Sequence, residues 1–369
     1  MARKAVYNGH APLRGWSAVR HMAIGVRMSS YRMDLTGTRD EAPLRPWLAS
    51  SFDTELDWYR LLARTALPPQ SAPAIWVSAG DGALRAALPV RSDGPGRLAA
   101  LGNFYTATFA PQLHAVADMS ALLRDMMTAE RAYSLDLQPL APEDLRYVPM
   151  RAAAEAAGLV CFDYFCFGNW YLPARGLRYD TYLAGRPGTL RSTLKRKGKK
   201  FFAAGGSVEV VTGGAALDAA LAAYQQVYDA SWKRAEPFPD FMPGFLRLCA
   251  ARGWLRLGVA RLNATPIAAQ VWVVREGHAA IYKLAYDDTQ AQWSAGSLLT
   301  AALMQRVLDE EQVDEVDYLI GDDAYKRDWM THRRERRGLR AYDPLRLRGL
   351  TAAIGEWGRR AVKRLLRRE

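Results

Sequence analysis

Three runs rich in apolar and β-branched residues follow one another in the second half of the chain, and such runs between turn residues are typical of β-strands. We expect these strands at residues 255–262, 267–275 and 278–286. The residues between them include Asn263, Pro266 and Gly277, which favour tight turns. The pattern therefore predicts a three-stranded meander.

The meander is followed by a helical pattern and one more strand. Apolar residues recur with helical spacing from Trp293 to about Gln312, and residues 315–320 have the composition of a buried strand. The first backbone N–H groups of a helix have no partner within the helix and can bind a phosphate or a developing oxyanion. We therefore expect an anion site where this helix begins.

The first half of the chain shows the same order of elements, although the two halves share no recognisable sequence repeat. Its helix, meander, helix and strand are expected from residue 53, at 74–78, 84–90 and 97–101, at 112–130 and at 132–137. A helix at 142–158 and a strand at 159–167 close this half. The second half opens with a basic helix at 189–203, a strand at 207–211 and helices at 216–232 and 241–252.

This repeated order predicts a mixed α/β (α+β) protein with two similar domains in tandem, each a mixed central sheet flanked by helices. The length of 369 residues and an apolar content of 50% suit two domains with substantial cores. We place the lead-in, the two domains and a basic amphipathic C-terminal helix at residues 1–40, 41–168, 169–345 and 346–369.

The charge balance favours a polyanionic partner. Fifty Lys and Arg residues against 38 Asp and Glu give a net charge of +12, although an arginine-rich genome would produce the same excess. The three cysteines and five histidines lack ligand spacing, so we expect no metal site. With no signal peptide or membrane span in the pattern, we expect a cytoplasmic protein, and contact with the inner face of the membrane remains open.

Three motifs in the second half carry a resemblance to a known family. They are Tyr286-Asp287-Asp288, the run from Trp293 to Leu299, and the run from Asp317 to Lys326 that contains Gly-Asp-Asp-Ala-Tyr-Lys. With weaker support from residues 52–67 and 102–105, the chain resembles the Fem-type, tandem members of the GNAT acyltransferase superfamily over about residues 52–344. This resemblance implies two GNAT-like domains, with the donor site in the second, and transfer of an acyl or aminoacyl group to an amine.

The expected donor loop departs from the usual pyrophosphate loop of the superfamily. Trp293 stands where Gln or Arg is usual, and Leu298 stands at the last small position. The backbone N–H groups of this loop remain available for an anion. We expect donor contacts from Trp293, Ser294, Ala295, Gly296 and Ser297, and from either Tyr282 or Lys283, because neighbours in a strand face opposite sides of the sheet. Gln270 is expected to be a satisfied interior residue or to line the same cleft.

Four residues after the last strand are the catalytic candidates. Asp322 or Asp323 would bind the ammonium group of the acceptor and take its proton, and a solvated turn is the alternative for both. Tyr325 would protonate the leaving atom. Lys326 would pair with a donor phosphate or stabilise an oxyanion, and an ordinary exposed lysine is the alternative.

Two basic runs are candidates for phosphate contact. The first carries six cations and no acid, namely Arg191, Lys195, Arg196, Lys197, Lys199 and Lys200. The second comprises Arg333, Arg334, Arg336, Arg337 and Arg340. A solvated helix face is the alternative for each run.

The C-terminal segment has a different pattern. Apolar residues at helical spacing from Leu350 to Leu366 are interleaved with arginine and lysine, which predicts a basic amphipathic helix that lies on an anionic membrane, binds nucleic acid or docks on the protein itself.

Together these features predict an acyltransferase that forms an amide on an amine acceptor, without a permanently bound cofactor. We favour aminoacyl-tRNA over acyl-CoA as donor, because of the altered donor loop and the clustered charge. The acceptor is a small molecule, a peptide or a lipid-linked precursor. A non-catalytic protein that binds nucleic acid or membrane on the same fold is the alternative from another class.

Overall fold

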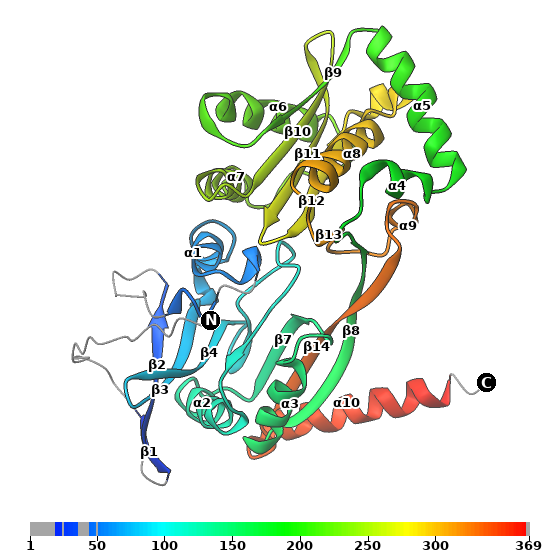
Figure 1. The fold of residues 1–369 in the computed structure, drawn as a ribbon. Coiled ribbons are helices and arrows are strands. Elements are labelled where there is room, and N and C mark those ends of the chain that lie inside the picture. Colours follow the sequence, from blue (N-terminus) through cyan, green and yellow to red (C-terminus); the bar gives the residue numbers. More distant parts are fainter. Residues whose placement is uncertain (1–18, 24–25, 36–43, 49–50, 367–369) are drawn as a thin grey trace. The chain divides into compact units, whose positions relative to one another are not determined.

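The computed structural model describes residues 19–23, 26–35, 44–48 and 51–366, and its contacts divide the chain into two compact units (Figure 1). Unit 1 comprises residues 1–63, 67–164 and 337–369, and unit 2 comprises residues 64–66 and 165–336. The division at residue 164 lies close to the expected boundary at residue 168. Residues 337–345, which we expected in the second domain, belong to unit 1 because they pair with a strand there.

Unit 1 is built on a mixed sheet. Its strands are β1 (Val19–Ala23), β2 (Val26–Asp34), β3 (Ala74–Gly80), β4 (Ala83–Ser92), β5 (Arg97–Ala100), β7 (Ser134–Leu140) and the end of β14 (His332–Tyr342), with the short β6 (Gln112–Leu113) beside β4. Among the described strand pairs of this unit, the pair of β5 and β7 is the parallel one. Its helices are α1 (Leu56–Thr65), α2 (Val116–Ala129), α3 (Tyr147–Ala156) and α10 (Leu347–Leu365).

We expected residues 1–40 to be a lead-in outside the two domains, but its second part contains two strands of the unit 1 sheet. Strands β1 and β2 form a hairpin, and β2 pairs with β3 from Met28 to Asp34. The segment has few alternating apolar residues, so its sequence pattern is weak, and pairing with a buried neighbour decides its structure. Residues 1–18, 24–25 and 36–40 of the lead-in lie outside the described residues.

Unit 2 repeats the sheet pattern of unit 1. Its strands follow the order β8 (Val160–Pro173), β13 (Glu315–Asp317), β12 (His278–Tyr286), β11 (Thr265–Arg275), β10 (Leu255–Leu262) and β9 (Gly206–Val211). Of these neighbours as the structure describes them, β12 and β13 pair in parallel and the others are antiparallel. Helices α6 (Leu217–Asp229) and α7 (Phe241–Ala251) cover one face, and α8 (Ala295–Gln305) covers the other (Figure 1). The remaining helices are α4 (Tyr179–Ala184), α5 (Gly188–Ala203) and α9 (Lys326–Trp329).

The last strand of unit 2 is shorter than expected. It ends at Asp317 rather than Ile320, because Leu319 and Gly321 adopt positive φ angles of 52° and 104° and turn the chain away from the sheet. The second basic run also differs from its prediction. It lies in β14, where Arg334 binds Glu315 and Asp317, and Arg340 binds Asp136, so these two cations are held in internal ion pairs.

The C-terminal helix α10 is shorter than the expected segment, and residues 367–369 lie outside the described part. None of the helices that the structure describes combines the length and apolar content needed to cross a bilayer.

Candidate functional site

Strands β12 and β13 of unit 2 part from each other after a short pairing. Their register runs from His278 to Ala280 of β12, and β13 then ends, whereas β12 continues to Tyr286. The second half of β12 therefore has no partner on this edge among the described strands. In this unpaired part of β12, the residues Tyr282, Lys283, Leu284 and Tyr286 are partly exposed, so a ligand can reach them.

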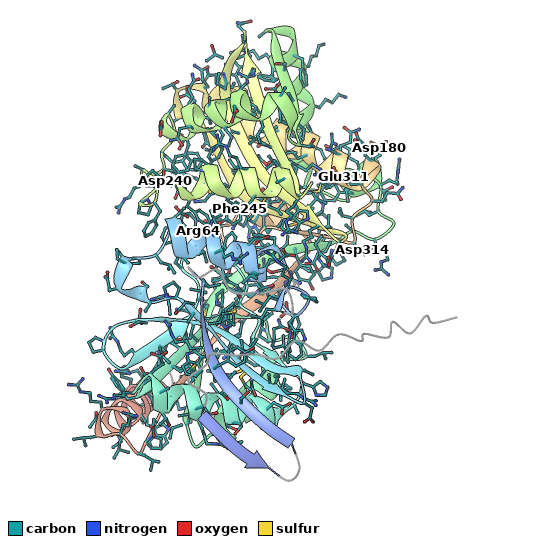
Figure 2. All side chains as sticks on the ribbon, turned by 90° about the vertical axis from the view of Figure 1, so that its left-hand side faces the viewer. Arg64, Asp180, Asp240, Phe245, Glu311 and Asp314 are labelled. Carbon is teal, nitrogen blue, oxygen red and sulfur yellow. The ribbon has the colours of Figure 1, made fainter. Side chains whose placement is uncertain are left out.

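A β-bulge re-aims the side chains of β12 at this point. Val271 of β11 is opposite Lys283, and Trp272 is opposite Ile281, so Tyr282 is an extra residue on its strand. Tyr282 and Lys283 consequently both contact the α6–α7 layer. The centroid of the Tyr282 ring lies 4.7 Å from that of Phe245 on α7, and Phe245 is labelled in Figure 2. The Nζ of Lys283 donates to Glu236 Oε1 at 2.7 Å. Our expectation that the two residues face opposite sides is wrong because of this bulge.

The expected donor loop leads into α8 with a left-handed residue. Ser294 has a φ of 54°, and its carbonyl oxygen accepts the N–H groups of Ser297 and Leu298. In the described part of the chain, the N–H groups of Ala295 and Gly296 have no backbone acceptor outside the helix. A Cβ on Gly296 would lie 3.5 Å from the Tyr286 ring. The start of α8 thus offers two donors beside an aromatic side chain.

The basic helix α5 packs directly against this loop. The Nζ of Lys197 donates to the carbonyl oxygen of Gln292 at 2.6 Å, and Gly198 approaches Leu298 of α8. The ring of Phe201 lies 6.4 Å from that of Trp293. The other five cations of the run are exposed, namely Arg191, Lys195, Arg196, Lys199 and Lys200. The structure therefore brings together two elements that we predicted to bind anions and that lie about a hundred residues apart in the sequence.

A buried network of side-chain hydrogen bonds connects strand β11 with the start of α8. Gln270 on β11 is 1% exposed, and its Nε2 donates to Gly296 O at 2.9 Å and to Thr300 Oγ1 at 2.7 Å. Its Oε1 accepts Trp272 Nε1 at 2.9 Å. Gln270 is thus a satisfied interior residue, and it fixes the first turn of α8 by hydrogen bonds in a dry environment.

Lys326 is buried beneath the loop that follows β13. Its Nζ donates to the carbonyl oxygens of Ile320 at 2.5 Å and Gly321 at 3.3 Å, and it lies 3.3 Å from Asp323 Oδ2. Burial lowers the pKa of Lys326, and the neighbouring Asp323 opposes this shift. Lys326 therefore shapes the loop and holds Asp323, and it is not the exposed lysine of the alternative prediction.

The two aspartates of the loop have different surroundings. The carboxylate of Asp322 accepts hydrogen bonds from Nε and Nη2 of Arg333 and, at 2.7 Å, from Nε1 of Trp170. The hydrogen bonds from Arg333 lower the pKa of Asp322. Asp323 remains 61% exposed. Asp322 is consequently a poor proton acceptor, whereas Asp323, although paired with Lys326, is exposed and accessible to a cationic ligand.

Tyr325 stands next to this pair. Its ring meets the buried Tyr318 edge to face at 5.7 Å, and burial raises the pKa of Tyr325 to about 12. Tyr325 is still 44% exposed, so the residue is accessible to a ligand and its hydroxyl stays protonated at neutral pH.

Sequence reasoning missed Lys233, which lies in the segment between α6 and α7. Burial, with help from the positive charge of Lys283, lowers the pKa of Lys233 to about 8, whereas Glu236 raises it. The charges of Lys326 and Asp323 also act on this amine, the first lowering and the second raising the pKa of Lys233. The segment has neither helical nor strand periodicity, and no motif in it marks a lysine for chemistry.

Comparisons with known proteins agree with this geometry. Residues 188–327, which include α5, the donor loop and Lys326, match the family described as acetyltransferase (GNAT) domain. None of the curated proteins matches the sequence. The family and the fold support an N-acyltransferase.

Three solved structures of similar fold cover most of the chain. FemX is 10% identical, covers 84% of this chain and 96% of its own, and has a TM-score of 0.58. A tandem GNAT protein from the clavulanic acid biosynthesis pathway is 16% identical, with coverages of 85% and 98% and a TM-score of 0.50. The C-terminal domain of a putative lysylphosphatidylglycerol synthetase from Agrobacterium fabrum is 16% identical, with coverages of 81% and 90% and a TM-score of 0.50.

At these identities the structural likeness concerns the fold, and it confirms the predicted fold class and the predicted resemblance. Residues 188–327 match the acetyltransferase (GNAT) domain family, in a chain that has the fold of FemX and of a tandem GNAT protein.

Proposed function

We propose that the protein transfers an aminoacyl group from aminoacyl-tRNA to an amine and so forms an amide. The observation that carries this proposal is the contact between the basic helix α5 and the loop that starts α8. Lys197 of α5 donates to this loop, the same helix carries five exposed cations, and the start of α8 offers two backbone N–H groups that suit an anion. An extended polyanion fits both elements at once.

The length of the charged surface distinguishes the two donors. Arg191 and Lys200 are nine residues apart in α5, which corresponds to about 14 Å along its axis. An RNA backbone offers phosphates in succession along such a surface, whereas coenzyme A offers its phosphates in a compact cluster. The acyl-CoA alternative would use the start of α8 and leave most of α5 in solvent.

The loop after β13 and Lys233 supply the groups for the chemistry. Asp323 binds the ammonium group of the acceptor, and Lys233, with a pKa of about 8, accepts a proton to give the neutral amine. The amine nitrogen then attacks the carbonyl carbon of the ester, a C–N bond forms, and the bond from that carbon to the ribose oxygen breaks. Tyr325 donates a proton to this oxygen, and the attacking nitrogen releases its second proton, which restores Tyr325 through solvent. Lys233 then returns the first proton to solvent.

Binding of the donor tests the proposal without knowledge of the acceptor. The purified protein is titrated with charged tRNA, acetyl-CoA and longer acyl-CoAs at two salt concentrations. The variant Lys195→Ala/Lys199→Ala removes two exposed cations of α5, and Lys363→Ala/Arg364→Ala removes two exposed cations of α10 as a charge-matched control. We expect the α5 variant alone to weaken tRNA binding and to reduce the slope of log K against log salt by about 1.4.

Other outcomes would contradict the proposal in distinct ways. Saturable acyl-CoA binding that is insensitive to the α5 variant would make acyl-CoA the donor. Equal loss in both variants would indicate non-specific attraction to a basic protein. Tight tRNA binding without transfer of the aminoacyl group to any of a panel of amines would indicate a binding protein on this fold.

A further inference from the structure

Helix α10 of unit 1 docks on its own unit through a narrow face. Gly349, Ala353 and Glu356 form the buried side, and a Cβ on Gly349 would lie 2.0 Å from the Asp343 carbonyl oxygen. The Nη2 of Arg360 donates to Asp163 O at 2.8 Å. The docked face therefore consists of small residues and a paired carboxylate, and the apolar residues of the helix lie elsewhere.

The apolar residues form a continuous stripe that is left in solvent. Successive helical residues are rotated by about 100°, which places the stripe to one side of the docked face. Its members and their exposed fractions are Leu347 at 77%, Leu350 at 40%, Ile354 at 55%, Trp357 at 56% and Leu365 at 66%. We call these five residues the α10 stripe. The edge of Trp357 still meets Phe162, with ring centroids 6.0 Å apart.

The charge of the helix is strongly positive. From residue 346 to 366 it carries Arg346, Arg348, Arg359, Arg360, Lys363 and Arg364. Its one acidic residue in this range, Glu356, is already bound by Arg359 and Arg360 at 2.7 and 2.9 Å. An exposed apolar stripe flanked by cations has the chemistry of a helix that lies in the interface of a membrane.

We propose that the α10 stripe docks on an anionic lipid surface, with the helix parallel to the membrane. A lipid surface satisfies both features, since the acyl region receives the apolar side chains and the headgroups receive the cations. A nucleic acid would satisfy the cations and leave the stripe in water. A second copy of the chain would cover the stripe but would bring two basic helices together without acidic partners.

Vesicle binding by the full chain tests this inference, with vesicles of phosphatidylglycerol and phosphatidylcholine in equal parts and vesicles of phosphatidylcholine alone. The variant Ile354→Ser/Leu365→Ser alters the stripe. The matched control Val362→Ser/Leu366→Ser alters one branched residue and one leucine of the same helix at exposed fractions of 56% and 68%, away from the stripe. Circular dichroism and thermal unfolding establish that both variants remain folded.

We expect binding to the anionic vesicles only, weakened by salt, and reduced about tenfold or more by the stripe variant but much less by the control. Absence of binding by the wild-type chain, equal binding to neutral vesicles or equal loss in both variants would overturn the inference. A concentration-dependent dimer that the stripe variant abolishes would assign the stripe to a second copy instead. Loss of RNA binding in the stripe variant, with vesicle binding intact, would assign it to nucleic acid.

Discussion

The ammonium group of Lys326 donates to the carbonyl oxygen of Ile320 at a distance of 2.5 Å, and the Lys326 residue is only 4% exposed. We predicted Lys326 as a catalytic candidate that pairs with a donor phosphate or an oxyanion, whereas in the structure its ammonium group binds the backbone of the loop after β13. The loop in turn carries Asp323 and Tyr325 to the place where β12 and β13 part. Lys326 is therefore a positioning residue, and Asp323 and Tyr325 are the groups that can meet a substrate.

Replacement of Lys326 by Met should destabilise the protein. Removal of the ammonium group leaves the carbonyl groups of Ile320 and Gly321 without their donor. We therefore expect the free energy of unfolding to fall by about 3 kcal/mol. Asp323→Asn should change it by less than about 1 kcal/mol, because Asp323 is exposed. Urea denaturation of both variants measures the difference, and equal stabilities would show that the lysine contacts are not structural.

Lys233 should titrate far below an ordinary lysine. Labelling of amines over a range of pH, followed by mass spectrometry, should give a pKa of about 8 for this residue. Glu236→Gln should lower the pKa and Lys283→Met should raise it, because the carboxylate favours the charged form and the second cation opposes it. Shifts in the same direction in both variants would contradict the proposed surroundings.

The same titration has a consequence for stability. The pKa of Lys233 is depressed in the folded state, so the unfolded chain binds more protons between about pH 8 and the ordinary lysine value of 10.5. The contribution of Lys233 to the free energy of unfolding should therefore rise with pH in this window. Comparison of wild type with Lys233→Met by urea denaturation at both ends of the window isolates this contribution, and a contribution that falls with pH would refute the assignment.

Two glycines near α8 should respond differently to alanine. A Cβ on Gly258 of β10 would lie 2.8 Å from Leu299 and 2.9 Å from Leu303, so Gly258→Ala should cost about 1–3 kcal/mol of stability. A Cβ on Gly296 meets only an ordinary contact at 3.5 Å. Gly296→Ala should fold normally but bind the donor more weakly, because a methyl group then stands beside the free N–H groups. Thermal unfolding and donor titration separate the two effects, and unimpaired donor binding by Gly296→Ala would remove the start of α8 from the site.

Tyr325→Phe should keep the ring contact with Tyr318 and lose the proton donor. We expect unchanged stability and a fall in transfer rate of about 100-fold or more at saturating donor. A single-turnover assay with preloaded donor measures the chemical step apart from binding. A rate close to that of wild type would show that another group protonates the leaving oxygen.

Much of unit 2 could be predicted because its elements follow local rules. The bounds of β10 and β12 agree with the predicted β-type runs, and α5 and α8 begin within two residues of their expected starts. The hairpin β1–β2 and strand β14 could not be predicted in the same way. Their sequences are polar or arginine-rich, and pairing partners far along the chain decide their structure.

The candidate site was predictable in its motifs and not in its contacts. The Gly-Asp-Asp-Ala-Tyr-Lys run marked the right loop, but burial of Lys326 and the pairing of Asp322 with Arg333 depend on the turn at Leu319 and on β14. The bulge at Tyr282 and the burial of Lys233 arise from packing between elements, which no period in a single sequence encodes.

The assignment of residues 337–369 to unit 1 has a consequence for biosynthesis. The chain emerges from the ribosome in order, and domains generally fold as they appear. Strand β7 cannot acquire its neighbour β14 until all of unit 2 has been synthesised, so unit 1 waits with an unpaired edge while unit 2 is completed. A nascent chain halted just after residue 336 should therefore carry a complete unit 2 and a unit 1 that still lacks one strand, and this order makes the first-translated half the last to mature.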